Sequence, residues 1–227
     1  MKYTLGSHDD IGDDRNGNAC DGLTNWDSRH RYFVDQLGGR EDWIARAKCR
    51  LAWALNVAMP GTPMLFMGSE CHMASPYVSW GYGHDGCDVN GDHRFDWSIA
   101  GDPLGIEIRR LVGACNSVRW QNPALRADSF CLSHEDYVNQ VLGFTRQLYD
   151  NTVLVVVNLS DRTFADHSYG VRTGGIGGQW TQVLCTQDAE FGRWHGAGNA
   201  YYEPWTQPDG QLYVNLPKWS VVIFRRR

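Results

Sequence analysis

Helical periodicity ends at Pro123 and does not return, so the sequence on either side of this residue must adopt different kinds of structure. Before it, residues 41–59 and 102–122 repeat apolar side chains every three or four positions, which predicts two amphipathic helices. After it, short apolar runs alternate with Gly, Asn and Asp turns, which is typical of antiparallel strands. We therefore predict two domains, residues 1–125 and residues 126–227.

A strand is predicted before each helix. Residues 3–7 indicate a short strand, and residues 62–68 are continuously apolar, as expected of a strand covered on both faces of a parallel sheet. Asp102 followed by Pro103 supplies an N-cap and a first-turn residue for the second helix. Two strand–helix units belong to a parallel sheet or barrel. Because two parallel strands do not make a stable sheet, we expect residues 1–125 to be the last part of a larger fold.

The downstream region is predicted to be an all-β domain. Turn residues separate its apolar runs, as at Asp150-Asn151 and Asp209-Gly210. The runs predicted as strands are residues 141–147, 153–159, 181–184, 212–216 and 220–225.

Composition excludes several classes of partner. The formal net charge is −5 and the sequence pI is about 5.9, with no basic stripe, so we expect no nucleic acid partner. No apolar stretch approaches the length of a membrane span, and the first residues contain no signal-peptide run. The seven cysteines include no C-x-x-C pair, which indicates free thiols in a reducing compartment. We expect a soluble, cytoplasmic protein.

Three motifs occur in a fixed order along the chain. The run from Ser7 to Asp10 (Ser-His-Asp-Asp) stands at the end of the first predicted strand, where (β/α)₈ barrels place their active sites. The run Pro60–Glu70 (Pro-Gly-Thr-Pro-Met-Leu-Phe-Met-Gly-Ser-Glu) follows the first helix, and Asn122–Leu125 (Asn-Pro-Ala-Leu) follows the second. Together they resemble the α-amylase superfamily of glycoside hydrolases over nearly the whole chain. The Ser-His-Asp followed by an acidic residue is most similar to the 1,4-α-glucan branching enzymes.

The resemblance implies a fold and a chemistry. The fold would be α/β plus all-β: the last two βα units of a TIM (β/α)₈ barrel, with strands seven and eight, followed by a C-terminal antiparallel β-sandwich. The chemistry would be a retaining reaction on an α-1,4-linked glucan or oligosaccharide. In that reading Asp9 stabilises the oxocarbenium-like transition state and His8 binds sugar hydroxyls. Asp10 either binds acceptor glucan or is an exposed loop carboxylate, and Trp80 either stacks on glucan or packs its own loop.

One departure from the family pattern limits the expected activity. The family carries its nucleophilic Asp on the fourth barrel strand and its acid/base Glu on the fifth. Both positions lie further upstream of His8 than this sequence extends. We therefore expect the chain alone to be inactive and to need an N-terminal barrel half, in the same or another chain, as its partner.

Several alternatives remain open at this stage. The first alternative to a branching enzyme is an α-amylase-type or trehalose-releasing hydrolase of the same superfamily. The second is a non-catalytic glucan-binding module. No cofactor and no metal site is expected, because the acidic loops fail the EF-hand frame where it requires Gly and have Ala19 and His93 instead. Structural calcium does occur in amylase relatives, so it stays open. One or two tryptophans of the β region form either core or a secondary starch site; they are Trp180, Trp194, Trp205 and Trp219.

Overall fold

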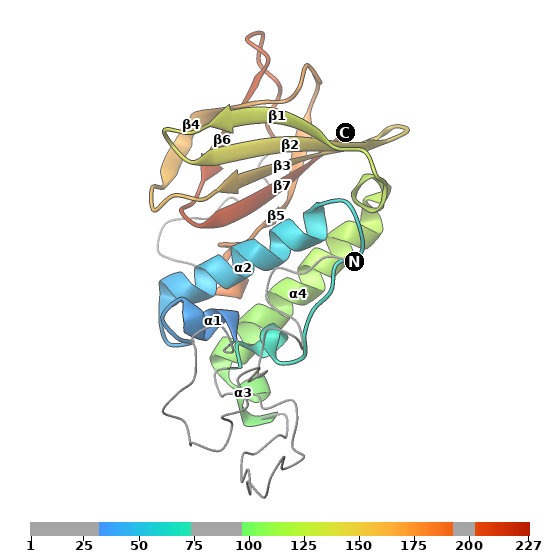
Figure 1. Cartoon of the computed structure of the whole chain (residues 1–227). Coiled ribbons are helices and arrows are strands. Elements are labelled where there is room, and N and C mark those ends of the chain that lie inside the picture. The colour runs from blue at the N-terminus through green and yellow to red at the C-terminus, as the bar shows by residue number, and fades with distance from the viewer. Residues whose placement is uncertain (1–31, 74–96, 193–202) are drawn as a thin grey trace, which may run out of the picture.

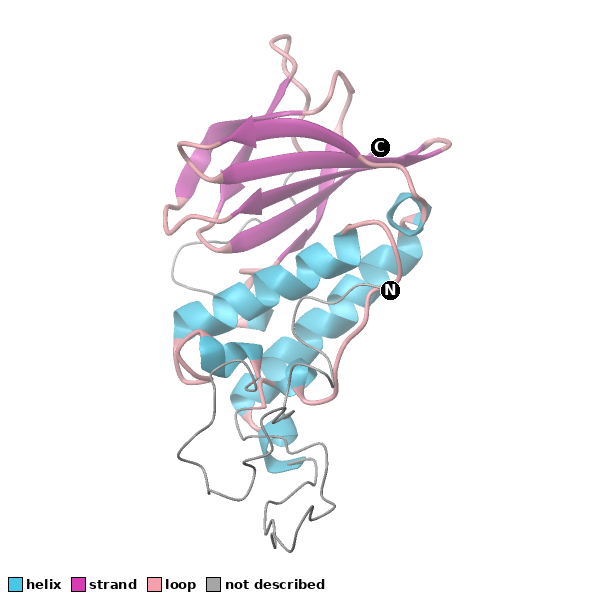
Figure 2. Cartoon of the chain, viewed as in Figure 1, coloured by secondary structure: helices cyan, strands magenta, loops and turns pink. Residues whose placement is uncertain are grey.

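The computed structural model describes residues 32–73, 97–192 and 203–227, and these form three layers (Figures 1 and 2). Helices cover one face of a five-stranded antiparallel sheet, and a two-stranded sheet covers the other face. The helices are α1 (Phe33–Gln36), α2 (Trp43–Ala58), α3 (Trp97–Gly101) and α4 (Pro103–Gln121), with short 3₁₀ turns η3 (Ser69–Cys71), η5 (Pro123–Arg126) and η6 (Ala189–Phe191). The strands are β1 (Cys131–Asp136), β2 (Val141–Leu148), β3 (Asn151–Asn158), β4 (Phe164–Arg172), β5 (Trp180–Cys185), β6 (Gln211–Leu216) and β7 (Ser220–Arg226).

Both predicted helices are confirmed, with small changes at their ends. Asp42 caps α2, since its Oδ1 accepts from the backbone N–H of Ile44 at 2.6 Å, so the helix begins two residues later than the prediction. Asp102 caps α4 as predicted, because its Oδ1 accepts from Gly105 N–H at 2.8 Å. The last turn of α4 ends at Asn122, whose side chain donates to Val118 O at 2.7 Å.

The antiparallel β-sandwich is also confirmed. The five-stranded sheet has the order β1-β2-β3-β7-β5, and β4 pairs with β6 in the second sheet. β3 lies at the centre and is buried on both faces, which explains its uninterrupted run of β-branched and leucine residues. Its odd-numbered residues Val153, Val155 and Val157 pack against the helices, and Leu154 and Val156 pack against the second sheet.

Two strands lack a clear signal in the sequence. β1 is an edge strand with a bulge between Leu132 and His134, and most of its residues are exposed or half-buried. β4 is interrupted by an irregular stretch between Phe164 and Tyr169, where Asp166 and His167 both have a left-handed backbone (φ 56° and 53°). In each strand the irregularity breaks the period-two pattern on which a strand prediction depends.

The strand predicted at residues 62–68 is wrong for the structure described. Only Pro63 occupies a bridge position there, and Met64, Leu65 and Phe66 are half-buried instead of buried. A strand of this apolar kind requires a neighbour along its length, and no described segment lies in register with it. The strand predicted at residues 3–7 lies outside the described residues, so the barrel assignment and the boundary at residue 125 stay predictions.

Two arginines join the C-terminal end of α2 to the rest of the fold, one from the sheet and one from α4. Arg146 on β2 is fully buried, and its guanidinium donates to the carbonyls of Ala58, Ala127 and Ser129. Arg119 on α4 donates to Val57 O at 2.6 Å, to Leu125 O at 2.5 Å and to Gly61 O at 2.8 Å. Both side chains therefore satisfy carbonyls at the C-terminal end of α2, where a helix has no partners of its own.

We expect Arg146→Met to destabilise the fold by at least about 3 kcal/mol, because it removes a buried donor and leaves three carbonyls unsatisfied. The stability of Arg146→Lys should lie between that of Arg146→Met and that of the wild type, since an ammonium cannot reproduce the planar fork of donors. Urea unfolding followed by circular dichroism measures both. Arg110→Met, at an exposed position on α4, is the matched control, and an equal loss of stability there would contradict the assignment.

Candidate functional site

The residues that the sequence assigns to the active site lie outside the described residues. This holds for His8, Asp9, Asp10 and Trp80, and for both acidic loops considered for calcium. Their roles therefore stay predictions. What the structure does describe is the segment that follows the predicted eighth strand, from Gly68 to Met73.

This segment is a tight turn held by two left-handed residues. Gly68 (φ 93°) precedes η3 and His72 (φ 54°) follows it. A Cβ at Gly68 would lie 2.5 Å from the Tyr32 hydroxyl, so the close approach of Tyr32 also requires glycine there. That hydroxyl donates to Met67 O at 3.0 Å. The turn thereby fixes the backbone positions from which the Glu70 and His72 side chains project.

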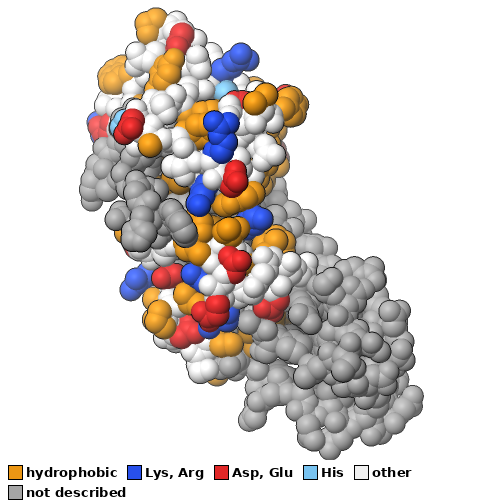
Figure 3. Space-filling view, turned by 90° about the vertical axis from the view of Figure 1, so that its left-hand side faces the viewer, with side chains coloured by type: hydrophobic (Ala, Val, Ile, Leu, Met, Phe, Trp, Pro, Cys, Tyr) orange, Lys and Arg blue, Asp and Glu red, His pale blue; other side chains and the backbone are white. Residues whose placement is uncertain are grey.

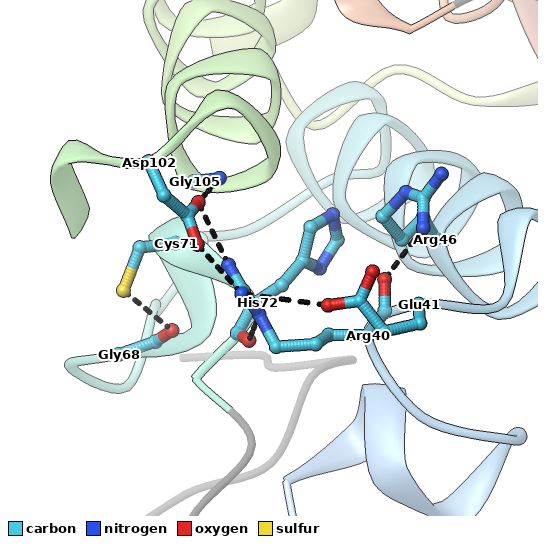
Figure 4. Close-up of polar contacts among 8 residues, drawn as sticks. All are labelled: Arg40, Glu41, Arg46, Gly68, Cys71, His72, Asp102 and Gly105. Atoms are coloured by element: carbon cyan, nitrogen blue, oxygen red, sulfur yellow. Dashed lines mark hydrogen bonds and ion pairs between the residues drawn. The ribbon is translucent and has the colours of Figure 1, made fainter. Parts of the chain in front are cut away.

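An ion pair ties the turn to both long helices (Figure 4). Arg40, just before α2, donates to both carboxylate oxygens of Asp102 at 2.6 and 2.8 Å, and its Nε donates to His72 O at 3.2 Å. Because Asp102 also caps α4, the Arg40–Asp102 pair links the start of α4 and the segment before α2 to the turn, which Arg40 contacts. The hydrogen bond from Arg40 holds the pKa of Asp102 below its usual range.

A group of buried polar side chains lies beside this ion pair. Arg50 on α2 is fully buried and donates to Gln187 Oε1 at 2.9 Å, while its Nε and Nη1 have no partner in the described part of the chain. Within the same described ranges, partners are also lacking for Arg46 Nε, Ser69 Oγ, Glu70 Oε2 and His72 Nε2. Unsatisfied buried polar atoms are rare in folded proteins, so their concentration here distinguishes this corner from most of the described core.

His72 is a neutral imidazole at physiological pH. Its side chain is buried, and desolvation followed by the charges of Arg50, Arg46 and Arg40 lowers its pKa to about 3. A group that stays deprotonated down to this range is not a general acid near neutral pH. The cavity beside it has a volume of about 10 Å³, room for one water and none for a sugar ring. The cavity beside His72 therefore does not bind a sugar.

The described ranges also bear on metals and membranes. Nowhere in residues 32–73, 97–192 and 203–227 do three His, Cys, Asp or Glu side chains gather as a metal site would require. None of the helices in those ranges has the length and apolarity to cross a bilayer. On the face shown in Figure 3, the Lys and Arg side chains of the described residues are interspersed with Asp and Glu.

Sequence reasoning missed this buried polar group, although one signal was present. Arg50 occupies the apolar stripe of its helix, three residues after Ala47 and four before Ala54. An arginine at a core position predicts a buried partner. Its partner Gln187 lies 137 residues away, in the β region, and no local pattern identifies it.

The β region matches a known protein family. Residues 132–227 match the family model described as the alpha amylase C-terminal all-beta domain. Among curated proteins, 1,4-alpha-glucan branching enzyme GlgB 2 of Xanthomonas euvesicatoria is 32% identical over 168 residues, which is 70% of this chain and 20% of that protein. GlgB of a Jannaschia species is 30% identical over 205 residues, which is 85% of this chain and 27% of that protein. The chain thus spans between a fifth and about a quarter of the length of these relatives.

Solved structures share the fold over a longer part of the chain. The α-amylase of Geobacillus thermoleovorans, solved with acarbose, has a TM-score of 0.58 at 17% identity and covers 86% of this chain and 35% of its own. AmyP in complex with maltose has a TM-score of 0.59 at 14% identity, with 82% and 35% covered. At these identities the likeness shows the fold alone.

We expect protonation of His72 to destabilise the protein. Because the folded-state pKa (about 3) lies below the ordinary value of 6.5, the unfolded chain binds more protons between these values, and stability is lost as the pH falls through that range. The slope due to His72 approaches about 1.4 kcal/mol per pH unit. His72→Asn keeps a residue that tolerates the left-handed backbone and removes the titration.

Urea unfolding of both proteins at several pH values between 6.5 and 4 gives the slope difference, in which the shared carboxylates cancel. A wild-type profile parallel to that of His72→Asn would show that His72 is protonated in the folded state as readily as in water.

Proposed function

Residues 132–227 form an α-amylase C-terminal all-β domain, and from this premise we propose that the chain is the C-terminal part of a glucan-active retaining enzyme of the 1,4-α-glucan branching type. The observation that carries the proposal is the match to branching enzymes, which extends over 70–85% of the chain and therefore well upstream of the β domain. The shared fold with α-amylase structures over 86% of the chain supports the same reading.

The helical layer has a defined place in this proposal. In this proposal, α2 and α4 correspond to the helices that follow the seventh and eighth strands of a (β/α)₈ barrel. The partner is then an N-terminal barrel half that belongs to the same enzyme.

The chemistry follows the retaining scheme. One carboxylate attacks the anomeric carbon while a carboxylic acid protonates the departing glucan oxygen, and an acceptor hydroxyl later displaces the enzyme carboxylate. Both of these groups are expected upstream. From this chain, Asp9 stabilises the positive charge that develops on the sugar ring, and His8 donates to sugar hydroxyls, because fixed charges and dipoles favour the transition state over the ground state. Asp10 and Trp80 contact acceptor or donor glucan.

Two further points belong to the proposal. A cytoplasmic location accords with the thiols of Cys49, Cys71, Cys115 and Cys185, which are free and buried. A hydrolase of the same superfamily is the second candidate, since α-amylases share the fold. The linkage of the product separates the two, because branching forms α-1,6 bonds and hydrolysis forms reducing ends.

The test compares the chain alone with the chain joined to the upstream part of its gene, assayed on amylose. We expect no activity from the chain alone and α-1,6-linked product from the joined protein. Asp9→Asn should lower kcat about a hundredfold or more in the joined protein. Asp161→Asn, at an exposed position in the β domain, is the matched control and should leave kcat unchanged.

Activity from residues 1–227 alone, abolished by Asp9→Asn, would contradict the expectation that the nucleophile and the acid/base lie upstream. Reducing ends without α-1,6 bonds would decide for the hydrolase. No activity in the joined protein would reject the catalytic proposal in favour of a binding module.

A further inference from the structure

A tryptophan stands exposed on a rigid part of the β domain. Trp205 has 58% of its surface accessible to solvent. Its backbone is nevertheless fixed, because it forms a bridge with Gln179 and its neighbours pair with the same segment: Pro204 O accepts from Trp180 N–H at 2.9 Å, and Thr206 N–H donates to Gly178 O at 3.0 Å. An exposed indole on an ordered backbone loses little conformational entropy when a ligand stacks on it.

Other tryptophans of the described chain are already engaged. Trp180 is fully buried, and its indole N–H donates to Thr206 Oγ1 at 3.0 Å. A cation covers the ring of Trp120, where Arg126 lies 5.0 Å from the centroid, and the ring of Trp219, where Lys48 lies at 4.3 Å. No Lys or Arg of the described ranges lies over Trp205 in this way. Its ring face is available for a ligand.

Polar side chains line the same face beside the indole. The bridge puts Gln179 directly opposite Trp205, and the two-residue period of extended chain puts Glu203 and Thr181 on that face as well. Gln179 Nε2 donates to Glu203 Oε2 at 3.3 Å, and Arg227 donates to Glu203 and, at 3.1 Å, to Thr181 Oγ1. These contacts hold an amide, a carboxylate and a guanidinium in place next to the ring.

The charges of this face favour a neutral ligand. The carboxylate of Glu203 is paired with the guanidinium of Arg227, so the two formal charges offset each other. Arg226 is engaged separately, because its Nε donates to Gly177 O at 2.8 Å. An anion would require unpaired cations beside the ring. A sugar requires an apolar platform for its C–H face and amide or carboxylate groups for its hydroxyls, and both are present.

We propose that Trp205, Gln179 and Glu203 form a binding subsite for a neutral glucan chain on the β domain. The indole stacks against one face of a glucose ring, while Gln179 and Glu203 bond the hydroxyls at its edge. That the sugar is an α-1,4-glucan rests on the proposed function, but the stacking site does not depend on the catalytic residues.

Calorimetry of the 227-residue chain with maltoheptaose tests the subsite. Trp205→Ala should weaken binding about tenfold, and Trp205→Tyr, which keeps an aromatic platform, should retain most of it. Trp120→Ala is the matched control, since it also removes an exposed tryptophan (74% accessible), and it should bind as the wild type does. Gln179→Ala should weaken binding about threefold, as expected for the loss of a solvent-accessible hydrogen bond. Circular dichroism verifies that each variant is folded.

Equal affinity of the wild type and Trp205→Ala would overturn the proposal, as would absence of maltoheptaose binding by the wild type or binding that 0.5 M salt abolishes, roughly the range where ionic contacts are screened. The joined protein separates this result from the enzymatic proposal. Activity on amylose without binding that depends on Trp205 rejects only the subsite. Binding that depends on Trp205 without activity supports the subsite and rejects only the enzymatic proposal.

Discussion

The hydrogen bonds from Arg146 and Arg119 to backbone carbonyls are the contacts on which the described structure most depends. They meet at the end of α2, where the helical layer, the 3₁₀ turn η5 and strand β2 come together. Desolvation lowers the pKa of Arg146 to about 10, which still leaves it charged at neutral pH. A buried cation surrounded by carbonyl dipoles fixes direction as well as distance, because the planar guanidinium accepts few alternative arrangements. The helices therefore sit on the sheet in one orientation.

The core of the molecule follows from that junction. Apolar residues of α2 and α4 share a single cluster with the helix-facing side of the sheet, including Val153, Val155 and Ile223. A separate cluster lies between the two sheets and includes Trp180 and Phe224. Because β3 and β7 contribute to both clusters, each strand transmits packing from the helices to the second sheet. The helical layer and the second sheet are thus packed against opposite faces of the same two strands.

Much of this fold can be predicted from the sequence, and the failures have physical causes. The helices, the cap at Asp102 and five of the strands follow from local periodicity and capping chemistry. The irregular pairing of β1 and β4 obscures their strand pattern in the sequence. The apolar run from Thr62 to Gly68 forms no strand because no described segment pairs along its length. The partners of Arg146 and Arg50 lie up to 88 and 137 residues away, beyond any sequence window. For the candidate site, a resemblance in short motifs pointed to Asp9 and His8, whereas nothing local pointed to the buried polar group around His72.

The two proposals about glucan rest on different parts of the chain. The residues proposed for catalysis, Asp9 and His8, come from a sequence motif outside the described residues. The face around Trp205 is complete within the described residues, since its backbone and its polar neighbours all belong to the β domain. The proposed subsite thus rests on described contacts, whereas the proposed catalytic role rests on sequence resemblance.

The apolar contact between α2 and the sheet also limits how a β domain of this kind can be exchanged between proteins during evolution. Suppose that recombination near Pro123 transferred the β domain alone to a relative. The domain would carry an apolar face that packs against these particular helices, formed by Val153, Val155, Val221 and Ile223. Unless the new helices offered a complementary surface and a carbonyl cluster for Arg146, that face would stay partly open to water. We therefore expect the β domain to be inherited together with the two helices that cover it, and substitutions across this contact to accumulate in pairs.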